Sequence, residues 1–257
     1  MDLKDRVAVV TGGAQGIGRA LAERFAAEGA AAVVIADVDA ELAARTAAAI
    51  GAVSIPTDVA DERAVFALVG EVERRWGRID LFCCNAAVAA LGGPEVPDAD
   101  WARMWSTNVM AHVYAVRAVL PGMLRRSEGH VLHVASSAGL LTFPASLPYT
   151  ATKHAVVGLA EWLDIHYRRR GVSFSCLCPR AVLTERLVAS LPDPVQLVPD
   201  AVTPEVVATA VVDALAEGRF LVLPQNGVLD DVRRRATDHE AWLDSLREFV
   251  AQREDRT

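Results

Sequence analysis

Residues 11–20 read TGGAQGIGRA and directly follow the apolar run RVAVV of residues 6–10. Gly12, Gly16 and Gly18 in this stretch open a segment with helical character. Glycine permits a positive φ and lets the backbone approach a ligand without a clash from a Cβ atom. Free N–H groups at a helix start attract anions, so a strand, this turn and a helix favour a phosphate site. The turn alone is weak evidence, because tight strand–helix turns also use glycine.

Short runs rich in β-branched residues alternate with longer segments of helical pattern along the whole chain. The runs are mostly apolar, which predicts parallel strands that are covered on both faces. Alternating strands and helices predict βαβ units, and therefore an α/β fold with a doubly wound parallel sheet in one domain over residues 1–257. The seven predicted strands are residues 6–11, 31–36, 52–56, 79–84, 130–136, 172–178 and 220–223.

Two segments near the C-terminus depart from this rhythm. Residues 185–203 contain three prolines between a predicted strand and a helix that starts at Thr203-Pro204, which predicts a lid over a substrate. Residues 228–257 are strongly charged but carry apolar residues at helical spacing, which predicts an amphipathic helix. This helix packs either on its own domain or on a neighbouring subunit. Glycines predict the ends of five earlier helices, at positions 29, 51, 77, 171 and 218.

Composition excludes several classes of function. The chain has 257 residues, of which 52% are hydrophobic, and a net charge of −7. An acidic protein is a poor partner for nucleic acid, which normally requires a basic face. The N-terminus lacks the pattern of a signal peptide, and no apolar stretch approaches the roughly 18 residues of a membrane span. We therefore expect a soluble, cytoplasmic protein without a nucleic-acid or membrane partner.

The four cysteines occur as Cys83-Cys84 and Cys176-x-Cys178 within strand-like runs. Neither pair has the CxxC spacing of a zinc site, and no histidine stands at ligand spacing beside them. We expect reduced, buried thiols and no metal site.

Two acidic positions indicate a nucleotide at the glycine turn. Asp37 ends the second predicted strand, 19 residues beyond Gly18, where an acid binds the ribose hydroxyls of NAD. Asp58-Val59 follows the third predicted strand, at the edge where an adenine ring would rest. Because Asp37 would repel a 2′-phosphate, it favours NAD over NADP.

Five motifs in this order resemble those of the short-chain dehydrogenase/reductase family, over residues 5 to about 224. The motifs are TGxxxGxG from Thr11, CNAA (84–87), Asn108, SSAG (136–139) and YTATK (149–153). The resemblance implies a Rossmann-like fold of seven parallel strands, a nicotinamide cofactor and a homotetramer or homodimer. NADP-using relatives carry a basic residue next to the acid or in the glycine loop, where this chain has Val38 and Gln15.

Tyr149 and Lys153 are four residues apart, so they share one face of a predicted helix. A nearby ammonium lowers the pKa of a tyrosine, which is about 10 for the free group.

Ser136 ends the fifth predicted strand, and its hydroxyl would stabilise the substrate oxygen; the family pattern Ser-x-x-Gly favours it over Ser137. Asn108, in the fourth predicted helix, matches the family asparagine that perturbs its helix and holds a water in a proton relay.

Two positions depart from the family pattern. Ala87 stands where the family has the glycine of Asn-Ala-Gly, and Arg180 follows Pro179 where the family has Pro-Gly. Arg180 binds an anionic substrate or a cofactor phosphate, or it faces solvent or an interface. Thr184 keeps the family threonine that bonds the carboxamide. The cofactor contacts carried over are Gly12, Gln15, Gly16, Ile17, Gly18, Asp37, Val38, Asp58, Val59, Asn85, Ala86, Ala87, Tyr149, Lys153, Pro179, Arg180, Val182 and Thr184.

These residues predict an NAD-dependent oxidoreductase that interconverts a secondary alcohol and a ketone. The candidate pocket is apolar and favours a hydrophobic small molecule, steroid- or terpenoid-like. One alternative is an NADPH-dependent reductase of carrier-bound 3-oxoacyl groups. Asp37 disfavours this alternative, because its charge would repel the 2′-phosphate of NADPH. Another is a non-catalytic NAD-binding sensor, a class that commonly loses the tyrosine or the lysine. The pocket residues are Val88, Leu91, Leu140, Leu141, Phe143, Leu147, Leu183 and Leu187.

Overall fold

The computed structural model of the chain describes residues 1–190 and 200–254. The middle of the predicted lid, residues 191–199, therefore lies outside the described residues. The structure confirms the predicted seven-stranded parallel sheet, whose strand order is β3-β2-β1-β4-β5-β6-β7. The strands are β1 (Val7–Thr11), β2 (Ala32–Asp37), β3 (Val53–Pro56), β4 (Leu81–Cys84), β5 (Gly129–Val134), β6 (Val172–Leu177) and β7 (Leu221–Val222).

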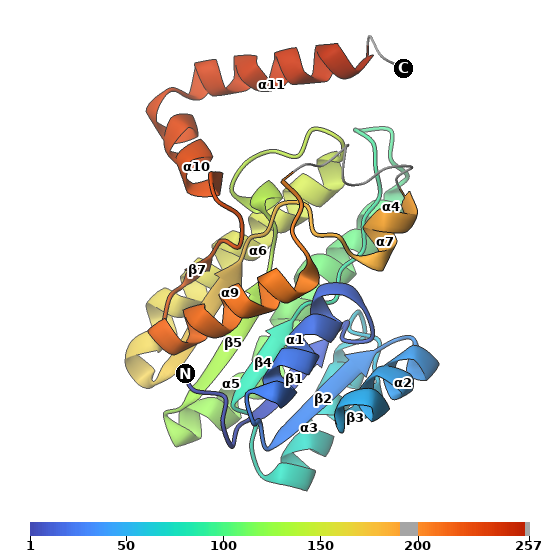
Figure 1. Cartoon of the computed structure of the whole chain (residues 1–257), viewed down its shortest axis with the longest axis vertical. Coiled ribbons are helices and arrows are strands. Elements are labelled where there is room, and N and C mark those ends of the chain that lie inside the picture. The colour runs from blue at the N-terminus through green and yellow to red at the C-terminus, as the bar shows by residue number, and fades with distance from the viewer. Residues whose placement is uncertain (191–199, 255–257) are drawn as a thin grey trace.

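Helices surround this sheet on both faces (Figure 1). Between β1 and β6 lie α1 (Gly16–Ala27), α2 (Ala40–Ile50), α3 (Glu62–Trp76), α4 (Asp98–Trp105), the π-helical turn η1 (Ser106–Met110), α5 (Ala111–Arg126), the 3₁₀ turn η2 (Ser137–Gly139), α6 (Leu147–Tyr167) and the 3₁₀ turn η3 (Arg168–Arg170). After β6 come α7 (Glu185–Ser190), α9 (Pro204–Glu217), α10 (Val228–Thr237) and α11 (His239–Glu254).

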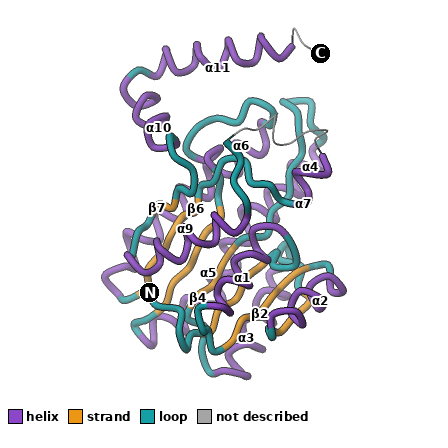
Figure 2. The backbone as a smooth tube through the Cα atoms, viewed as in Figure 1, coloured by secondary structure: helices purple, strands orange, loops and turns teal. Residues whose placement is uncertain are grey.

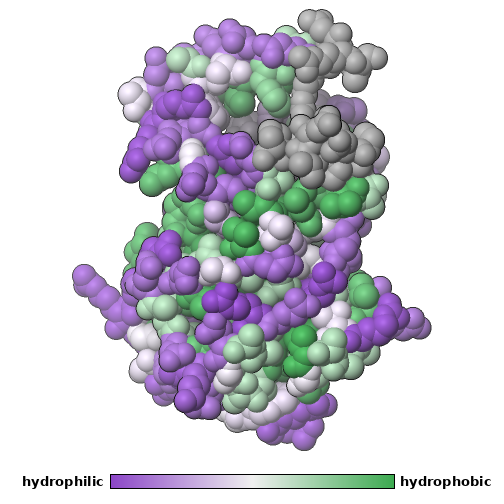
Figure 3. Space-filling model, in the orientation of Figure 1, coloured by the Kyte–Doolittle hydropathy of each residue, from purple (hydrophilic) through white to green (hydrophobic). Residues whose placement is uncertain are grey.

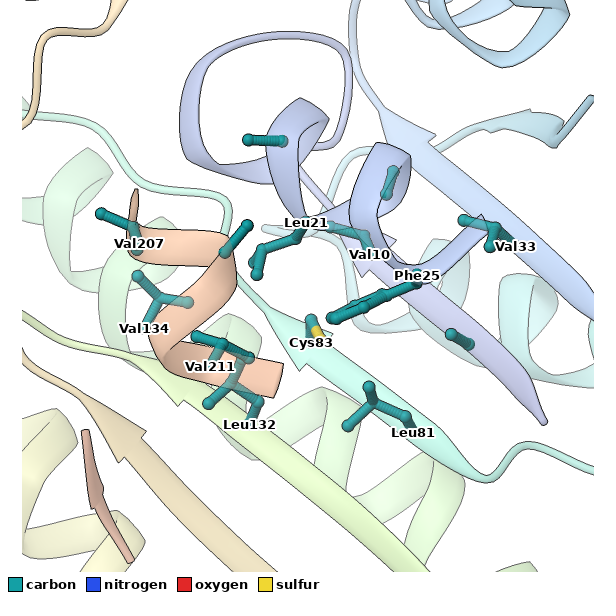
Figure 4. Close-up of a cluster of buried hydrophobic side chains, with 14 of the residues drawn as sticks. Val10, Leu21, Phe25, Val33, Leu81, Cys83, Leu132, Val134, Val207 and Val211 are labelled. Carbon is teal, nitrogen blue, oxygen red and sulfur yellow. The ribbon is translucent and has the colours of Figure 1, made fainter. Parts of the chain in front are cut away.

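The sheet separates hydrophobic cores, because successive side chains of a strand point to opposite faces. In β1, Ala8 and Val10 belong to the core under α1 and α9, whereas Val7 and Val9 belong to the core under α3 and α5. Figure 4 shows the first core, where Phe25 of α1 lies over the sheet close to α9. Burial on both faces explains why the strands are apolar throughout rather than alternating.

Long loops gather beyond the carboxyl ends of the strands (Figure 2). β1 lies between β2 and β4, so the chain crosses to the other half of the sheet after β3. Parallel α/β sheets bind ligands at such a switch point, beyond the carboxyl ends of the strands. The fold therefore brings the loops after β1, β4, β5 and β6 to one edge.

Helix boundaries follow the predicted signals. Gly51, Gly77, Gly171 and Gly218 end their helices with positive φ values of 68°, 76°, 83° and 67°. Thr203 is the N-cap of α9, although its side chain makes no capping hydrogen bond. Within residues 1–190 and 200–254, no helix has the length and apolar character needed to cross a bilayer.

The C-terminal segment forms two helices where the sequence predicts one. Helix α10 ends at Asp238, whose extended backbone (φ −144°) turns the chain into α11. Trp242 of α11 is buried, and the guanidinium of Arg234 on α10 lies 5.6 Å from its ring centroid. Figure 1 shows α10 and α11 as an arm above the sheet, near its carboxyl edge.

Candidate active site

The turn between β1 and α1 leaves no room for a side chain at Gly12 or Gly18. Gly12 has a φ of 61°, and a Cβ atom there would lie 2.8 Å from the Cα atom of Ala86. A Cβ atom at Gly18 would lie 2.1 Å from the carbonyl oxygen of Gly12. Helix α1 begins at Gly16, and its N-cap residue Gln15 makes no side-chain capping bond. The first amide groups of α1 are therefore available to another acceptor.

Asn85 fastens the end of β4 to this turn. Its side-chain amide donates to the carbonyl oxygens of Thr11 and Gly12 at 2.9 and 3.0 Å. The Thr11 hydroxyl oxygen accepts from the backbone N–H groups of Asn85 and Ala86 at 2.9 and 3.2 Å. Both amide hydrogens of Asn85 are thus used inside the protein, and Ala87 follows at the edge of the site.

A carboxylate lies at the start of α1. The backbone N–H of Gly16 donates to Oε2 of Glu185 at 3.1 Å, and Oε1 of the same carboxylate pairs with Nη2 of Arg19 at 2.8 Å. Thr184 packs beside it, because a Cβ atom at Gly16 would lie 3.0 Å from the Thr184 methyl carbon. The glycine turn therefore binds an anion that the chain itself supplies. Sequence reasoning missed Glu185, since 169 residues separate it from Gly16.

Asp37 faces the glycine turn from the end of β2. Its Oδ2 accepts from the backbone N–H of Ala14 at 3.1 Å, and its Oδ1 accepts from the backbone N–H of Asp39 at 3.1 Å. Val38 beside it is 77% exposed, so the edge next to the acid is open. Two further predicted contacts follow β3, the exposed Asp58 and the buried Val59.

Helix α6 presents Tyr149 and Lys153 on one face. Its N-cap Ser146 accepts from the backbone N–H of Tyr149 at 3.2 Å, and Pro148 stands in the first turn. The Lys153 Nζ atom lies 5.5 Å from the Tyr149 ring centroid and donates to the carbonyl oxygen of Val134 at 2.9 Å. Lys153 is only 1% exposed, and burial lowers its pKa to about 8.

Ser136 meets Tyr149 from the loop after β5. Burial raises the pKa of Tyr149, and a side-chain hydrogen bond with Ser136 opposes part of that rise. The Ser136 oxygen also accepts from the backbone N–H of Ala138 at 3.1 Å. A Cβ atom at Gly139 would lie 2.4 Å from the carbonyl oxygen of Lys153. A glycine at this position therefore lets the serine loop pack directly on α6.

Asn108 lies in the π-helical turn η1, between α4 and α5, and is fully buried. Its Oδ1 accepts from the backbone N–H of Val88 at 2.8 Å. Its Nδ2 donates to the carbonyl oxygen of Val88 at 2.8 Å and to Oγ1 of Thr152 at 3.3 Å. The irregular helix agrees with the predicted perturbation, and the side chain joins the loop after β4 to α6. The proton relay through a water stays a prediction.

Arg180 points to the C-terminal arm, and its binding of an anionic substrate or a cofactor phosphate stays a prediction. Its guanidinium forms an ion pair with Asp231 of α10, and its backbone N–H donates to Oε1 of Gln225 at 3.1 Å. Gln225 in turn donates to the carbonyl oxygen of Ala181 at 2.9 Å. The substitution of the family glycine thus connects the loop after β6 to the C-terminal arm. Pro179, Val182 and Thr184, the other predicted contacts of this loop, lie beside Arg180.

An apolar ring contacts the tyrosine. The Phe143 ring meets that of Tyr149 edge-on, with centroids 6.2 Å apart. Phe143, Leu147 and Leu91 are 41%, 45% and 74% exposed, so their side chains are accessible to a ligand. On the face shown in Figure 3, apolar residues gather between the sheet and the C-terminal arm. Of the other candidate pocket residues, Leu141 is buried and Val88, Leu140, Leu183 and Leu187 are half-buried.

The sequence profile of the short chain dehydrogenase family matches residues 6–194. Because this match covers more than half of the chain, the protein belongs to the short-chain dehydrogenase/reductase family. It is an oxidoreductase of the class that acts on CH–OH groups.

Named relatives support this assignment along the chain. The 1-deoxy-11-beta-hydroxypentalenate dehydrogenase of Streptomyces exfoliatus is 37% identical over 94% of this chain and 90% of its own length. The 3beta-hydroxysteroid dehydrogenase of Mediterraneibacter gnavus is 32% identical over 73% of this chain and 71% of its own. A short-chain dehydrogenase/reductase of Burkholderia phymatum, solved in complex with NAD, is 35% identical with a TM-score of 0.85 over 94% of this chain and 96% of its own.

Proposed function

We propose that this enzyme interconverts a secondary alcohol and a ketone on a hydrophobic small molecule, with NAD as its cofactor. The observation that carries the proposal is the meeting of Ser136, Tyr149 and Lys153 at the sheet edge that also holds the glycine turn and Asp37. The groups come from β2, β5, α6 and the β1–α1 turn, and their convergence provides a general acid–base beside a dinucleotide site.

Each of the three catalytic residues has one task. Tyr149 takes the proton of the alcohol in one direction and returns it to the ketone oxygen in the other. Ser136 donates a hydrogen bond to that oxygen while its charge changes. The Lys153 ammonium, 5.5 Å from the phenol ring centroid, favours the phenolate and so counteracts the rise in pKa that burial causes. The nicotinamide cofactor, when bound, supplies the hydride acceptor or donor.

The residues at the turn fit a dinucleotide. The crowding at Gly12 and Gly18 marks a cradle that only glycine permits, and the contact of the Gly16 N–H with the Glu185 carboxylate supports an anion site at the start of α1. Gly16 and the neighbouring amides would hold the diphosphate. Asp37 would accept from the adenosine ribose hydroxyls, and its charge would oppose the 2′-phosphate of NADP.

Asp37→Ser is expected to raise the ratio of kcat/KM for NADP to that for NAD by about tenfold or more, which corresponds to about 1.4 kcal/mol. The cause is the loss of both the ribose contact and the repulsion of a 2′-phosphate. Asp39→Ser is the matched control, because Asp39 is a neighbouring acid that caps α2 through the backbone N–H of Leu42. A parent enzyme that already prefers NADP would refute this role of Asp37.

Glu185→Gln is expected to tighten NAD binding roughly two- to fivefold, because an anion at a helix start contributes about 0.3–1 kcal/mol. The carboxylate and the cofactor diphosphate would compete for the same Gly16 N–H. Titration of intrinsic fluorescence with NAD measures the Kd. Glu23→Gln is the control, since Glu23 also pairs with Arg19, at 3.6 Å, from within α1. Equal Kd values for both variants would exclude this competition.

The substrate class is tested by following nicotinamide absorbance with hydrophobic alcohols and ketones, and with polyols and carrier-linked 3-oxoacyl compounds as comparisons. The exposed apolar side chains of Phe143 and Leu147 near the tyrosine support the hydrophobic class. The names of the pentalenate and steroid relatives are in keeping with it. Faster turnover of polyols than of any hydrophobic alcohol would overturn this choice.

We also propose a homodimer or homotetramer. Helix α11 is charged and packs on α10 through Trp242, and a helix of 16 residues takes most of its stability from packing rather than from its own propensity. Contact with a second copy would give it a surface to pack on. Analytical ultracentrifugation of the full chain tests this, and a monomer at micromolar concentration would contradict it.

A further inference from the structure

Cys84, His112 and His133 form a buried cluster that the proposed mechanism does not use. Cys84 ends β4, His112 lies in the first turn of α5, and His133 lies in β5. One potential ligand atom from each residue lies within 4.8 Å of those of the other two. A thiolate and two imidazoles are a ligand set that soft transition-metal ions prefer.

The histidine pair leaves hydrogen-bonding capacity unused. Nδ1 of His112 lies 2.8 Å from Nδ1 of His133, so one ring donates and the other accepts. Both Nε2 atoms are buried without a partner in the described structure. Both imidazoles are buried, at 1% exposure for His112 and 0% for His133, so solvent does not reach these nitrogens.

A small cavity adjoins the cluster. It has a volume of about 10 Å³ and is lined by Cys84 and His112 together with Thr11, Ala86 and other residues. This is room for about one water-sized atom. The two ligand residues therefore border a space that an ion could enter without displacing the sheet.

We propose that Cys84, His112 and His133 bind one soft monovalent cation, Cu(I), with the cysteine as thiolate. In this step the Cys84 S–H bond breaks, its proton leaves to solvent, and a Cu–S bond forms without change of oxidation state. The charge of the site selects the ion. One thiolate neutralises a monovalent cation, whereas a divalent ion would leave a net positive charge near the Lys153 ammonium, which acts electrostatically on His112.

The chain offers an internal competitor and a matched control for this site. Sγ of Cys176 lies 3.7 Å from Sγ of Cys178, and both thiols are buried, so this pair could also take up Cu(I). Cys83 neighbours Cys84 but points to the opposite face of the sheet, into the core under α1. Cys83→Ser is therefore the matched control, because it replaces a neighbouring cysteine by serine, as Cys84→Ser does, without removing a ligand of the cluster.

The test is anaerobic titration of the full-length, cofactor-free protein with Cu(I) against a chromophoric Cu(I) chelator, with the bound copper counted by mass spectrometry. We expect the parent, C83S and the double variant C176S/C178S to keep the Cu(I) ion of this cluster. C84S should bind it about 100-fold more weakly or worse, since loss of a ligand costs more than loss of an outer-shell partner. Absence of binding in the parent, or loss only in C176S/C178S, would overturn the proposal.

X-ray absorption on the parent loaded with one equivalent of Cu(I) reports the ligands of the tightest site and does not depend on how the variants fold. One sulfur and two nitrogen scatterers per copper support the cluster. Two sulfurs without imidazole assign the ion to Cys176 and Cys178 and refute the proposal. This readout is independent of the dehydrogenase reaction, so it stands whether or not NAD is the cofactor.

Discussion

Tyr149→Phe is expected to lower kcat/KM by about a thousandfold, within the range that a positioned acid–base group contributes. The change removes only the phenolic oxygen that exchanges the substrate proton and meets Ser136. The ring, its edge contact with Phe143 and the helix that carries it stay. Stability should therefore stay close to that of the parent, and the Kd for NAD should change far less than kcat/KM. Steady-state kinetics, thermal unfolding and a binding titration measure the three quantities.

Tyr167→Phe is the matched control for this experiment. Tyr167 ends the same helix, is also half-buried, and its ring contacts Phe174 with centroids 6.3 Å apart. It lies away from the carboxyl edge of the sheet, so its variant should turn over like the parent. If Tyr149→Phe kept parental turnover on every productive substrate, another group would have to exchange the proton, and the mechanism proposed here would fail.

Gly18→Ala is expected to destabilise the fold by about 2–3 kcal/mol, the cost of forcing atoms into a packed site. The new methyl would lie 2.1 Å from the carbonyl oxygen of Gly12 and 2.5 Å from Nδ2 of Asn85, so the glycine turn must open. For a protein of this size the melting temperature should fall by roughly 5–10 °C. Binding of NAD should weaken together with it, because the same turn would hold the diphosphate.

Gly70→Ala makes the same chemical change as Gly18→Ala but is expected to raise stability rather than lower it. Gly70 lies inside α3, is exposed, and a Cβ atom there has nothing within 4 Å. Alanine should stabilise this helix by about 0.5–1 kcal/mol. Thermal and denaturant unfolding of the two variants separate the effects. If Gly18→Ala were as stable as Gly70→Ala, the interpretation that the turn has no room for a methyl group at Gly18 would be wrong.

Much of the fold could be predicted because its signals are local. Each strand lies within two residues of its predicted bounds, since apolar runs between glycine-ended helices leave little choice of position. β7 is shorter than predicted, at Leu221–Val222, because only these two residues pair with β6. The break at Asp238 escaped prediction, since no glycine or proline marks it; its signal is the Asp238 carboxylate, which accepts from the backbone N–H of Ala241 at 3.0 Å.

The parts of the site that escaped prediction depend on contacts between distant segments. Glu185 reaches Gly16 only because α7 folds back over the first turn of α1. Cys84, His112 and His133 come from three elements with no ligand spacing, so neighbours in the sequence gave no sign of a cluster. The partner of Arg180 lies on an arm whose position the sequence does not define. Each of these contacts becomes visible only when the sheet order is known.

The C-terminal arm contacts loops next to the catalytic residues, which affects how substrate preference could change in evolution. Arg180 of the loop after β6 pairs with Asp231, and Arg235 donates to the carbonyl oxygen of Leu140 in the loop after β5. One helix, α10, thus braces both loops beside the catalytic residues, and it lies beyond residue 194, where the family profile ends. Mutations in these contacts are expected to shift the two loops while Ser136, Tyr149 and Lys153 stay unchanged. The C-terminus is therefore a place where substrate preference can evolve separately from the chemistry.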